Sequence, residues 1–268
     1  MAMLHLSAWY NSLLSGDSAE CRTVSVIGSG GKTSLIWHLA ASLSPGRRIL
    51  VSPSTKMFVP ERKFYNWYFS GTLPIPAPGI TLAGIHSRAS GKLESYPLKV
   101  LGQIIPDYDL ALIEADGSGG LPLKAWNDAE PVVPSCTGLT IGVLPIWPLG
   151  KPLTGKIAFR RELFSSLTGA SEGELLAMEH MVKLIAGGNA GEEDMPALSG
   201  SGKTSLPGLF AKARGKKILF LSQIEDEESI VLARELAGLL PADFRAGLYG
   251  IIAGSVKEDT LEILHQPL

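Results

Sequence analysis

Apolar residues along this chain fall into short, nearly continuous runs, and these alternate with segments in which apolar positions recur at helical spacing. The continuous runs are residues 23–27, 48–51, 109–114, 139–144, 218–221 and 248–253. Such runs are typical of strands buried on both faces of a parallel sheet. The helical segments are residues 3–15, 157–168 and 227–240, and in the last of them Ile230, Ala233, Ala237 and Leu240 line one face.

Strands that alternate with helices predict an α/β fold with a doubly wound, mostly parallel sheet and helices on both faces. Residues 60–108 are rich in proline and glycine and are expected to form several short segments. Residues 1–268 are predicted to form a single domain. A Gly/Ser-rich stretch near 186–206 is predicted to be a flexible loop.

A glycine-rich loop follows the first apolar run. Residues 28–34 read Gly-Ser-Gly-Gly-Lys-Thr-Ser, and residues 35–43 continue with apolar positions at helical spacing. A strand, a glycine turn and a helix N-terminus together direct backbone N–H groups and partial positive charge at an anion. The loop is the short form G-x-x-G-K-T, because Val26 stands where the longer pattern G-x-x-x-x-G-K-[ST] has glycine.

This loop predicts a nucleoside triphosphate site in a fold like that of the P-loop NTPases. Lys32 is expected to reach the β- and γ-phosphates, and the Thr33 hydroxyl is expected to hold Mg²⁺. The residues predicted to bind the nucleotide here are Gly28, Ser29, Gly30, Gly31, Lys32, Thr33 and Ser34. The alternative is a glycine-rich turn that packs a helix closely against the sheet and binds nothing.

Two acids stand at the end of the run 109–114. Glu114 and Asp116 lie where a parallel sheet binds its ligand, beyond the carboxyl ends of the strands. Side chains at i and i+2 share one side of an extended strand, although a turn at Gly117 interrupts that geometry. Asp116 is the predicted Mg²⁺ ligand, and Glu114 is predicted to position the nucleophile. The alternative is that both carboxylates bond loop N–H groups.

Three basic residues outside the loop are further candidates. Lys56 is expected to meet a phosphate or an anionic second substrate, and Lys124 is a similar candidate in a proline-bearing loop. Arg160 is expected to stabilise the charge of the phosphoryl group in transfer, as arginine fingers do. Each of these can instead be a surface residue. The residues expected to be structural are His38, Trp126 and Trp147.

A second Lys-Thr string, residues 200–205, is not predicted to bind phosphate. An acidic segment precedes it in place of an apolar strand, and Pro207 follows where the motif needs an unbroken helix. The surrounding glycines favour a surface loop.

Composition narrows the class of protein. The 268 residues are 45% apolar and carry a net charge of −2, with no basic run, so neither nucleic acid nor a membrane surface is an expected partner. Cys21 and Cys136 form no metal or disulfide pattern, and both are expected to be buried apolar residues. The chain shows neither a signal-peptide pattern nor a run of 18 apolar residues, which favours a cytoplasmic enzyme.

From about residue 20 to 255, the chain resembles the YqeC-like family of selenium-dependent hydroxylase accessory proteins, which take part in selenium cofactor biosynthesis. The most specific match is Glu-Ala-Asp-Gly-Ser-Gly-Gly-Leu-Pro-Leu-Lys at 114–124. The other matching segments are residues 26–34, 54–57, 130–134, 150–153 and 160–164.

The resemblance implies a P-loop NTPase that uses Mg²⁺ and ATP or GTP, with a molybdenum/selenium hydroxylase or its maturation factors as partner. Guanine-specific proteins have Asn-Lys-x-Asp after a strand, where residues 222–225 here read Ser-Gln-Ile-Glu, so the base stays open. Two alternatives to hydrolysis also stay open. One is a nucleotide-gated binding protein with little catalysis, and the other is a small-molecule kinase or ligase.

Overall fold

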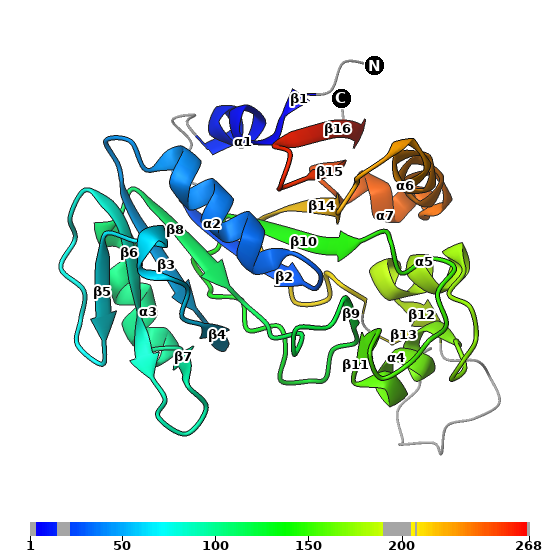
Figure 1. The fold of residues 1–268 in the computed structure, drawn as a ribbon, viewed down its shortest axis with the longest axis horizontal. Coiled ribbons are helices and arrows are strands. Elements are labelled where there is room, and N and C mark those ends of the chain that lie inside the picture. The colour runs from blue at the N-terminus through cyan, green and yellow to red at the C-terminus, as the bar shows by residue number, and fades with distance from the viewer. Residues whose placement is uncertain (1–3, 15–21, 190–204, 207, 267–268) are drawn as a thin grey trace.

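Parallel strands form the centre of a 12-stranded sheet in the computed structural model, which describes residues 4–14, 22–189, 205–206 and 208–266 (Figure 1). In spatial order the parallel strands are β15 (Gly250–Ser255), β14 (Lys216–Ser222), β10 (Leu139–Pro145), β2 (Thr23–Gly28), β8 (Leu110–Glu114), β3 (Arg48–Pro53) and β6 (Gly79–His86). The order places β2 in the interior of the sheet, between β8 and β10.

Shorter strands extend the sheet on both sides. Beyond β15 lie β16 (Thr260–His265) and β1 (Leu4–His5), which pair antiparallel. Beyond β6 lie β7 (Lys92–Glu94) and β4 (Lys56–Phe58), also antiparallel, whereas β5 (Trp67–Ser70) pairs parallel with β6. The sheet is therefore mostly parallel, with antiparallel additions at its edges.

Helices cover both faces of this sheet. Helices α1 (Leu6–Leu14) and α2 (Lys32–Leu43) pack on one face, where Leu110 and Leu112 of β8 belong to the same core. Helix α3 (Leu98–Ile104) packs with Ala111 and Ile113 on the opposite face. The helices α4 (Arg161–Thr168), α5 (Met178–Ala186) and α6 (Glu227–Leu239) pack on that opposite face beside β14 and β15. The predicted doubly wound α/β fold is confirmed.

Several boundaries differ from the predicted ones. The segment 157–168 begins as the strand β11 (Ala158–Phe159), and α4 starts only at Arg161, because Arg160 adopts the left-handed φ of 56°. Strand β11 pairs with β9 (Leu123–Lys124). Helices α3, α5 and α7 (Ala242–Ala246) were not predicted, nor was β6 inside the Pro/Gly-rich stretch. The expectation that Cys136 is buried is wrong, because it is exposed.

Part of the chain lies outside the described residues, including Cys21 and 200–204 of the second Lys-Thr string. Next to this part, β12 (Gly188–Asn189) pairs antiparallel with β13 (Ser205–Leu206). The flexible loop near 186–206 and the single domain over 1–268 stay predictions.

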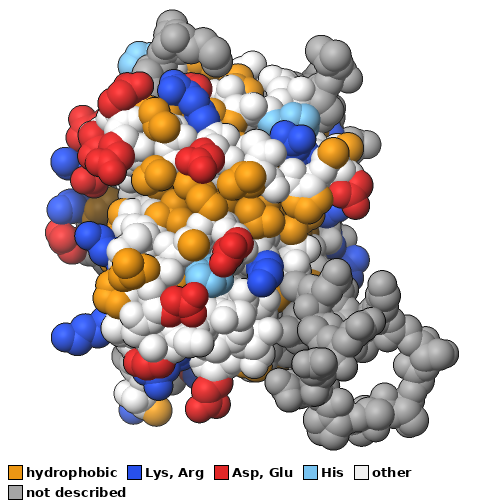
Figure 2. All heavy atoms as spheres, turned by 90° about the vertical axis from the view of Figure 1, so that its right-hand side faces the viewer, with side chains coloured by type: hydrophobic (Ala, Val, Ile, Leu, Met, Phe, Trp, Pro, Cys, Tyr) orange, Lys and Arg blue, Asp and Glu red, His pale blue; other side chains and the backbone are white. Residues whose placement is uncertain are grey.

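The surface on the side of α5, α6 and α7 carries apolar side chains that gather in a band across its middle, with charged side chains above and below (Figure 2). A folded protein exposes much apolar surface, so such a band alone assigns no function. None of the helices in the described ranges has the length and apolar character needed to cross a membrane.

Candidate functional site

The glycine-rich loop between β2 and α2 is packed tightly against the end of β10. Gly28 and Gly30 have φ values of 99° and 64°, which L side chains rarely adopt. A Cβ on Gly28 would overlap the Val143 carbonyl oxygen, and one on Gly30 would overlap the Pro145 ring. The Ser29 N–H donates to the Val143 carbonyl at 3.0 Å. The loop is therefore fixed without any ligand.

Helix α2 begins at Lys32 with its first turn open to an anion. Its N-cap is Gly31, and no side-chain hydrogen bond caps the helix. The first N–H groups of a helix lack intrahelical partners, so they are available to phosphate oxygens. From the other side, the Ser222 hydroxyl donates to the Gly30 carbonyl at 2.9 Å and holds the loop in place.

Lys32 is buried beneath the loop. Its Nζ donates to the Gly28 carbonyl at 2.6 Å and lies 3.2 Å from Oδ1 of Asp116. The side chain is 4% exposed, yet it contributes to the wall of the cavity described below. The Lys32 ammonium therefore already has a carboxylate partner, and it lies at the wall of the cavity.

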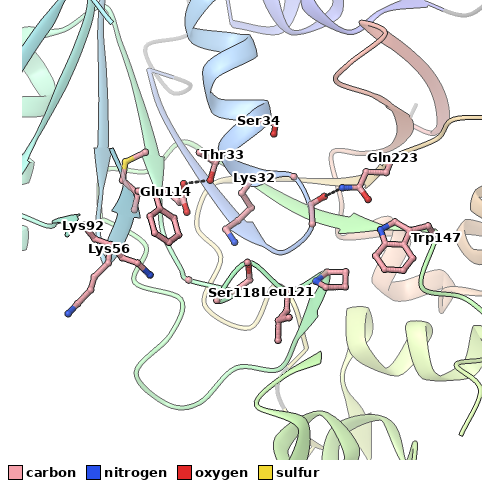
Figure 3. A pocket seen from close by; sticks show the side chains of 18 residues that line it. Lys32, Thr33, Ser34, Lys56, Lys92, Glu114, Ser118, Leu121, Trp147 and Gln223 are labelled. Atoms are coloured by element: carbon pink, nitrogen blue, oxygen red, sulfur yellow. Dashed lines mark hydrogen bonds between the residues drawn. The ribbon is translucent and has the colours of Figure 1, made fainter. Parts of the chain in front are cut away.

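Glu114 is the acid that meets Thr33. The Thr33 hydroxyl donates to Oε2 of Glu114 at 2.9 Å, and both side chains line the cavity (Figure 3). Burial raises the pKa of Glu114 above 4.5, although Lys32 and the Thr33 hydrogen bond oppose that shift. A hydroxyl beside a carboxylate at a phosphate loop is an oxygen pair suited to Mg²⁺.

Asp116 lies deeper and does not line the cavity. It is fully buried and accepts hydrogen bonds from the Gly28 N–H at 3.0 Å and from Trp126 Nε1 at 2.8 Å. Burial opposes its ionisation, but the charges of Lys32 and Lys124 hold the pKa of Asp116 below its usual value. The structure therefore brings Thr33 together with Glu114, and not with Asp116 as the sequence suggested.

A chain of buried charges continues from Asp116 to the start of α4. Lys124 is fully buried, and its Nζ lies 3.3 Å from Asp116 Oδ2 and 2.8 Å from Glu130 Oε2. Glu130 in turn accepts from Arg160 Nη1 at 2.8 Å. Arg160 does not line the cavity. Lys124 and Arg160 therefore anchor the loop that follows β8. Neither side chain lines the cavity beside the glycine-rich loop.

The cavity has a volume of about 370 Å³ and two long walls (Figure 3). One wall is the glycine-rich loop with the start of α2, and the other is the loop 117–122. Lys56 and Lys92 close one end, and Trp147 and Gln223 stand at the other. Phe58 lies beside Lys92 and lines the same end. The cavity thus runs along the carboxyl ends of the parallel strands, where ligands bind in sheets of this kind.

Sequence reasoning found the wall formed by the glycine-rich loop and Lys56 at one end, but it missed Phe58, Lys92 and Gln223 and the position of Trp147 on the wall. Lys56 lines the cavity but is 2.8 Å from Glu94, so its charge is already paired. Phe58 and Lys92 come from the short strands β4 and β7, which are far apart in the sequence and pair antiparallel. Trp147, expected in the core, is 43% exposed on the cavity wall, and Glu225 does not line the cavity.

The residues suited to a metal are few. The described residues contain no group of three or more His, Cys, Asp or Glu side chains that could enclose an ion. Mg²⁺ at phosphate sites keeps several waters and takes only one or two protein ligands besides the phosphates. The Thr33 hydroxyl and the Glu114 carboxylate fit that requirement.

His38, which was expected to be structural, connects α2 to another part of the fold. In α2 its Nε2 lies 2.9 Å from Oδ1 of Asp259, in the turn between β15 and β16. His38 therefore fixes the phosphate-loop helix to the far end of the sheet and stays away from the cavity.

Comparison with known proteins gives the family. The model of the YqeC protein family matches residues 24–162, which include every residue on the cavity wall except Gln223. Uncharacterized protein YqeC of Escherichia coli (strain K12) is 31% identical over 178 residues, which cover 63% of this chain and 70% of that protein. No solved structure matches the chain. This chain belongs to the YqeC family.

Proposed function

We propose that this protein binds a nucleoside triphosphate with Mg²⁺ in the cavity and transfers its γ-phosphoryl group to an oxygen nucleophile, with the nucleoside diphosphate as the leaving group. The observation that carries the proposal is the contact of Thr33 with Glu114, directly beside a rigid glycine loop and the uncapped start of α2. A turn that only packs a helix against a sheet needs no such oxygen pair at its open end.

Each residue has a part in this reaction. Backbone N–H groups from Gly30 to Thr33 hold the phosphate oxygens, and Lys32 turns from Asp116 toward the β- and γ-phosphates. Thr33 and Glu114 hold Mg²⁺, directly or through water, and the ion neutralises charge on the β- and γ-oxygens when bound. Asp116 holds the Lys32 side chain in place between turnovers.

The position of the Thr33–Glu114 pair also indicates which end of the cavity holds the phosphates and which end holds the nucleoside. The pair lies on the β8 side of the phosphate loop, so the γ-phosphate belongs there and the nucleoside extends the opposite way. At that opposite end the exposed ring of Trp147 offers a surface on which a base can stack, and Gln223 offers an amide. These groups suit a purine, and ATP and GTP are both candidates.

The test is calorimetric titration of ATP and of GTP, each with Mg²⁺, into the wild type, Lys32→Ala and Lys63→Ala. Lys63 is an exposed lysine that does not line the cavity, so it is the matched control. We expect binding to the wild type and the control, and a loss of at least about 100-fold in Lys32→Ala. Circular dichroism establishes that the variant is folded. No binding of either nucleotide to the wild type would overturn the proposal.

The role in the cell is proposed from the family resemblance. We infer that the cytoplasmic protein assists the maturation of a selenium-dependent molybdenum hydroxylase. A strain that lacks the protein is then expected to make normal amounts of hydroxylase with reduced specific activity. The wild-type gene restores that activity, and the gene with Lys32→Ala does not. Full hydroxylase activity in the deletion strain would contradict this role.

A further inference from the structure

The cavity continues past Glu114, away from the expected nucleoside end, into a space that the nucleotide does not need. Its floor is formed by β4 and β7, which pair antiparallel so that Phe58 lies opposite Lys92 and Lys56 lies opposite Glu94. This cross-strand register explains both contacts of the β4–β7 pair, because directly opposite side chains on a sheet interact. Lys56 is consequently opposite an acidic residue, whereas Lys92 is opposite an aromatic ring.

Among the lysines on the cavity wall, Lys92 is the one that forms no ion pair with a described acidic residue. Its Nζ lies 4.3 Å from the centroid of the Phe58 ring, and no acid of the described chain lies within 4 Å of it. Lys56 and Lys32, by contrast, are paired with Glu94 and Asp116. An ammonium with no direct ion pair, beside an aromatic ring that is 65% exposed, fits a ligand that carries an oxyanion and a less polar body.

The wall opposite Lys32 leaves room for such a ligand. Gly117 has no positive φ, and a Cβ built on it meets no atom within 4 Å. Neither backbone conformation nor packing therefore requires glycine at this position. Its missing side chain leaves space at the cavity wall near Ser118 and Glu114.

The cavity also restricts the chemistry of an acceptor. Among the described residues on its wall, Glu114 is the one acid and no histidine occurs. Glu114 is engaged with Thr33, so no second group stands ready to take a proton from a hydroxyl or amine. An acceptor that is already ionised at neutral pH needs no such base.

We propose that the Phe58–Lys92 end of the cavity binds the second substrate, a small molecule whose carboxylate or phosphate accepts the γ-phosphoryl group. This inference rests on the proposed function. One oxygen of the acceptor forms a bond to the γ-phosphorus, while the bond from that phosphorus to the β–γ bridging oxygen breaks. The electron pair leaves with the nucleoside diphosphate, and no proton moves. The products are the diphosphate and an acyl phosphate or a phosphoanhydride.

The experiment uses the full chain saturated with Mg²⁺ and a β,γ-imido nucleotide, whose affinity is measured first. Succinate and inorganic phosphate are then titrated as probes of the two acceptor chemistries. The variants are Lys92→Gln, Gly117→Ala and the control Lys63→Gln. Lys63 is matched because its Nζ also lies over a phenylalanine ring, 5.4 Å from the Phe64 centroid, but away from the cavity.

We expect saturable binding of at least one probe to the wild type, and the tighter probe identifies the acceptor chemistry. Lys92→Gln should weaken it about tenfold and Gly117→Ala should weaken it as well, whereas Lys63→Gln stays within about twofold. Nucleotide affinity should stay unchanged in Lys92→Gln. Failure of both probes, or wild-type probe affinity in Lys92→Gln, overturns the acceptor site alone. Failure of the nucleotide to bind overturns the proposed function and this inference with it.

Discussion

At the scale of single residues, two carboxylates that are two positions apart have opposite environments. Glu114 lines the cavity beside Thr33, whereas Asp116 is fully buried between Lys32 and Lys124. Burial raises the pKa of the first, and the two lysines overcome burial to lower the pKa of the second. The first is suited to a metal ion, and the second is suited to hold the structure together.

Replacement of Glu114 by Gln should separate binding from stability. We expect Mg²⁺-dependent nucleotide affinity to fall about tenfold or more, because the amide is a poor Mg²⁺ ligand. The free energy of unfolding should stay equal to that of the wild type or rise slightly, since a buried carboxyl with a raised pKa costs energy when it ionises. Nucleotide titrations with and without Mg²⁺, together with urea unfolding, test both parts. Unchanged Mg²⁺ dependence would contradict the assignment.

Replacement of Asp116 by Asn should act on stability first. The change is nearly isosteric but leaves Lys32 and Lys124 buried without their shared counter-charge, so we expect a loss of about 3 kcal/mol in urea unfolding. The exposed acid Asp109, which pairs with Arg48, is the control, and Asp109→Asn should cost at most about 1 kcal/mol. Equal losses in the two variants would show that Asp116 has no special structural role.

The sequence located this pair of acids and favoured Asp116 as the metal ligand, whereas the structure places Glu114 beside Thr33. Residues at i and i+2 on a strand point the same way, so either acid fitted the metal role. The chain leaves β8 at Glu114, and the groups that contact Asp116 come from separate segments: Gly28 and Lys32 from the glycine-rich loop, and Lys124 and Trp126 from the segment after β8. Contacts between distant segments of this kind are not encoded in local spacing.

At the scale of elements, the contact that holds the start of α4 in place indicates the role of Arg160. This residue precedes the helix in a left-handed conformation and donates to Glu130, which also accepts from Lys124. The interaction ties the helix to the loop 117–130 that forms a wall of the cavity. A periodic pattern over 157–168 indicated one helix, because a single left-handed residue leaves the apolar spacing intact.

Arg160→Met distinguishes an anchor from an arginine finger. We expect a stability loss of about 1–2 kcal/mol, because a partly buried charged hydrogen bond is removed, with the turnover rate within about twofold of wild type. A residue that stabilises the transferring phosphate would instead cost about 10³-fold or more in turnover. Steady-state release of nucleoside diphosphate, measured beside urea unfolding, separates the two roles.

At the scale of the whole molecule, the centre of the sheet was predictable and its edges were not. Strands β2, β8, β10 and β14 are buried on both faces, so their sequences are continuous apolar runs that stand out. The β4–β7 pair is short and partly exposed, and its register depends on pairing across some 35 residues. At the end of the cavity that this pair forms, the sequence indicated Lys56 but not Phe58 or Lys92.

One carboxylate joins the two ends of the chain to the phosphate-loop helix, and it should govern acid stability. Asp259 accepts from the Ser7 N–H at 2.8 Å and from its hydroxyl at 2.7 Å, and it lies 2.9 Å from His38 in α2 and 3.4 Å from His5. Burial opposes ionisation, but the Ser7 bonds and His38 lower the pKa of Asp259 below 3.8.

Because the folded-state pKa of Asp259 is depressed, its stabilisation is complete above the unfolded-state pKa of about 3.9 and disappears as the pH falls through the folded-state value. Asp259→Asn keeps the φ of 51°, which asparagine tolerates, and should cost about 2 kcal/mol at pH 5. The difference from wild type in urea unfolding should shrink at pH 3, whereas the exposed Asp128→Asn should show almost none at either pH. A difference that stays constant or widens below pH 4 would mean that the ionised carboxylate is not what joins α1 and α2 to the turn between β15 and β16.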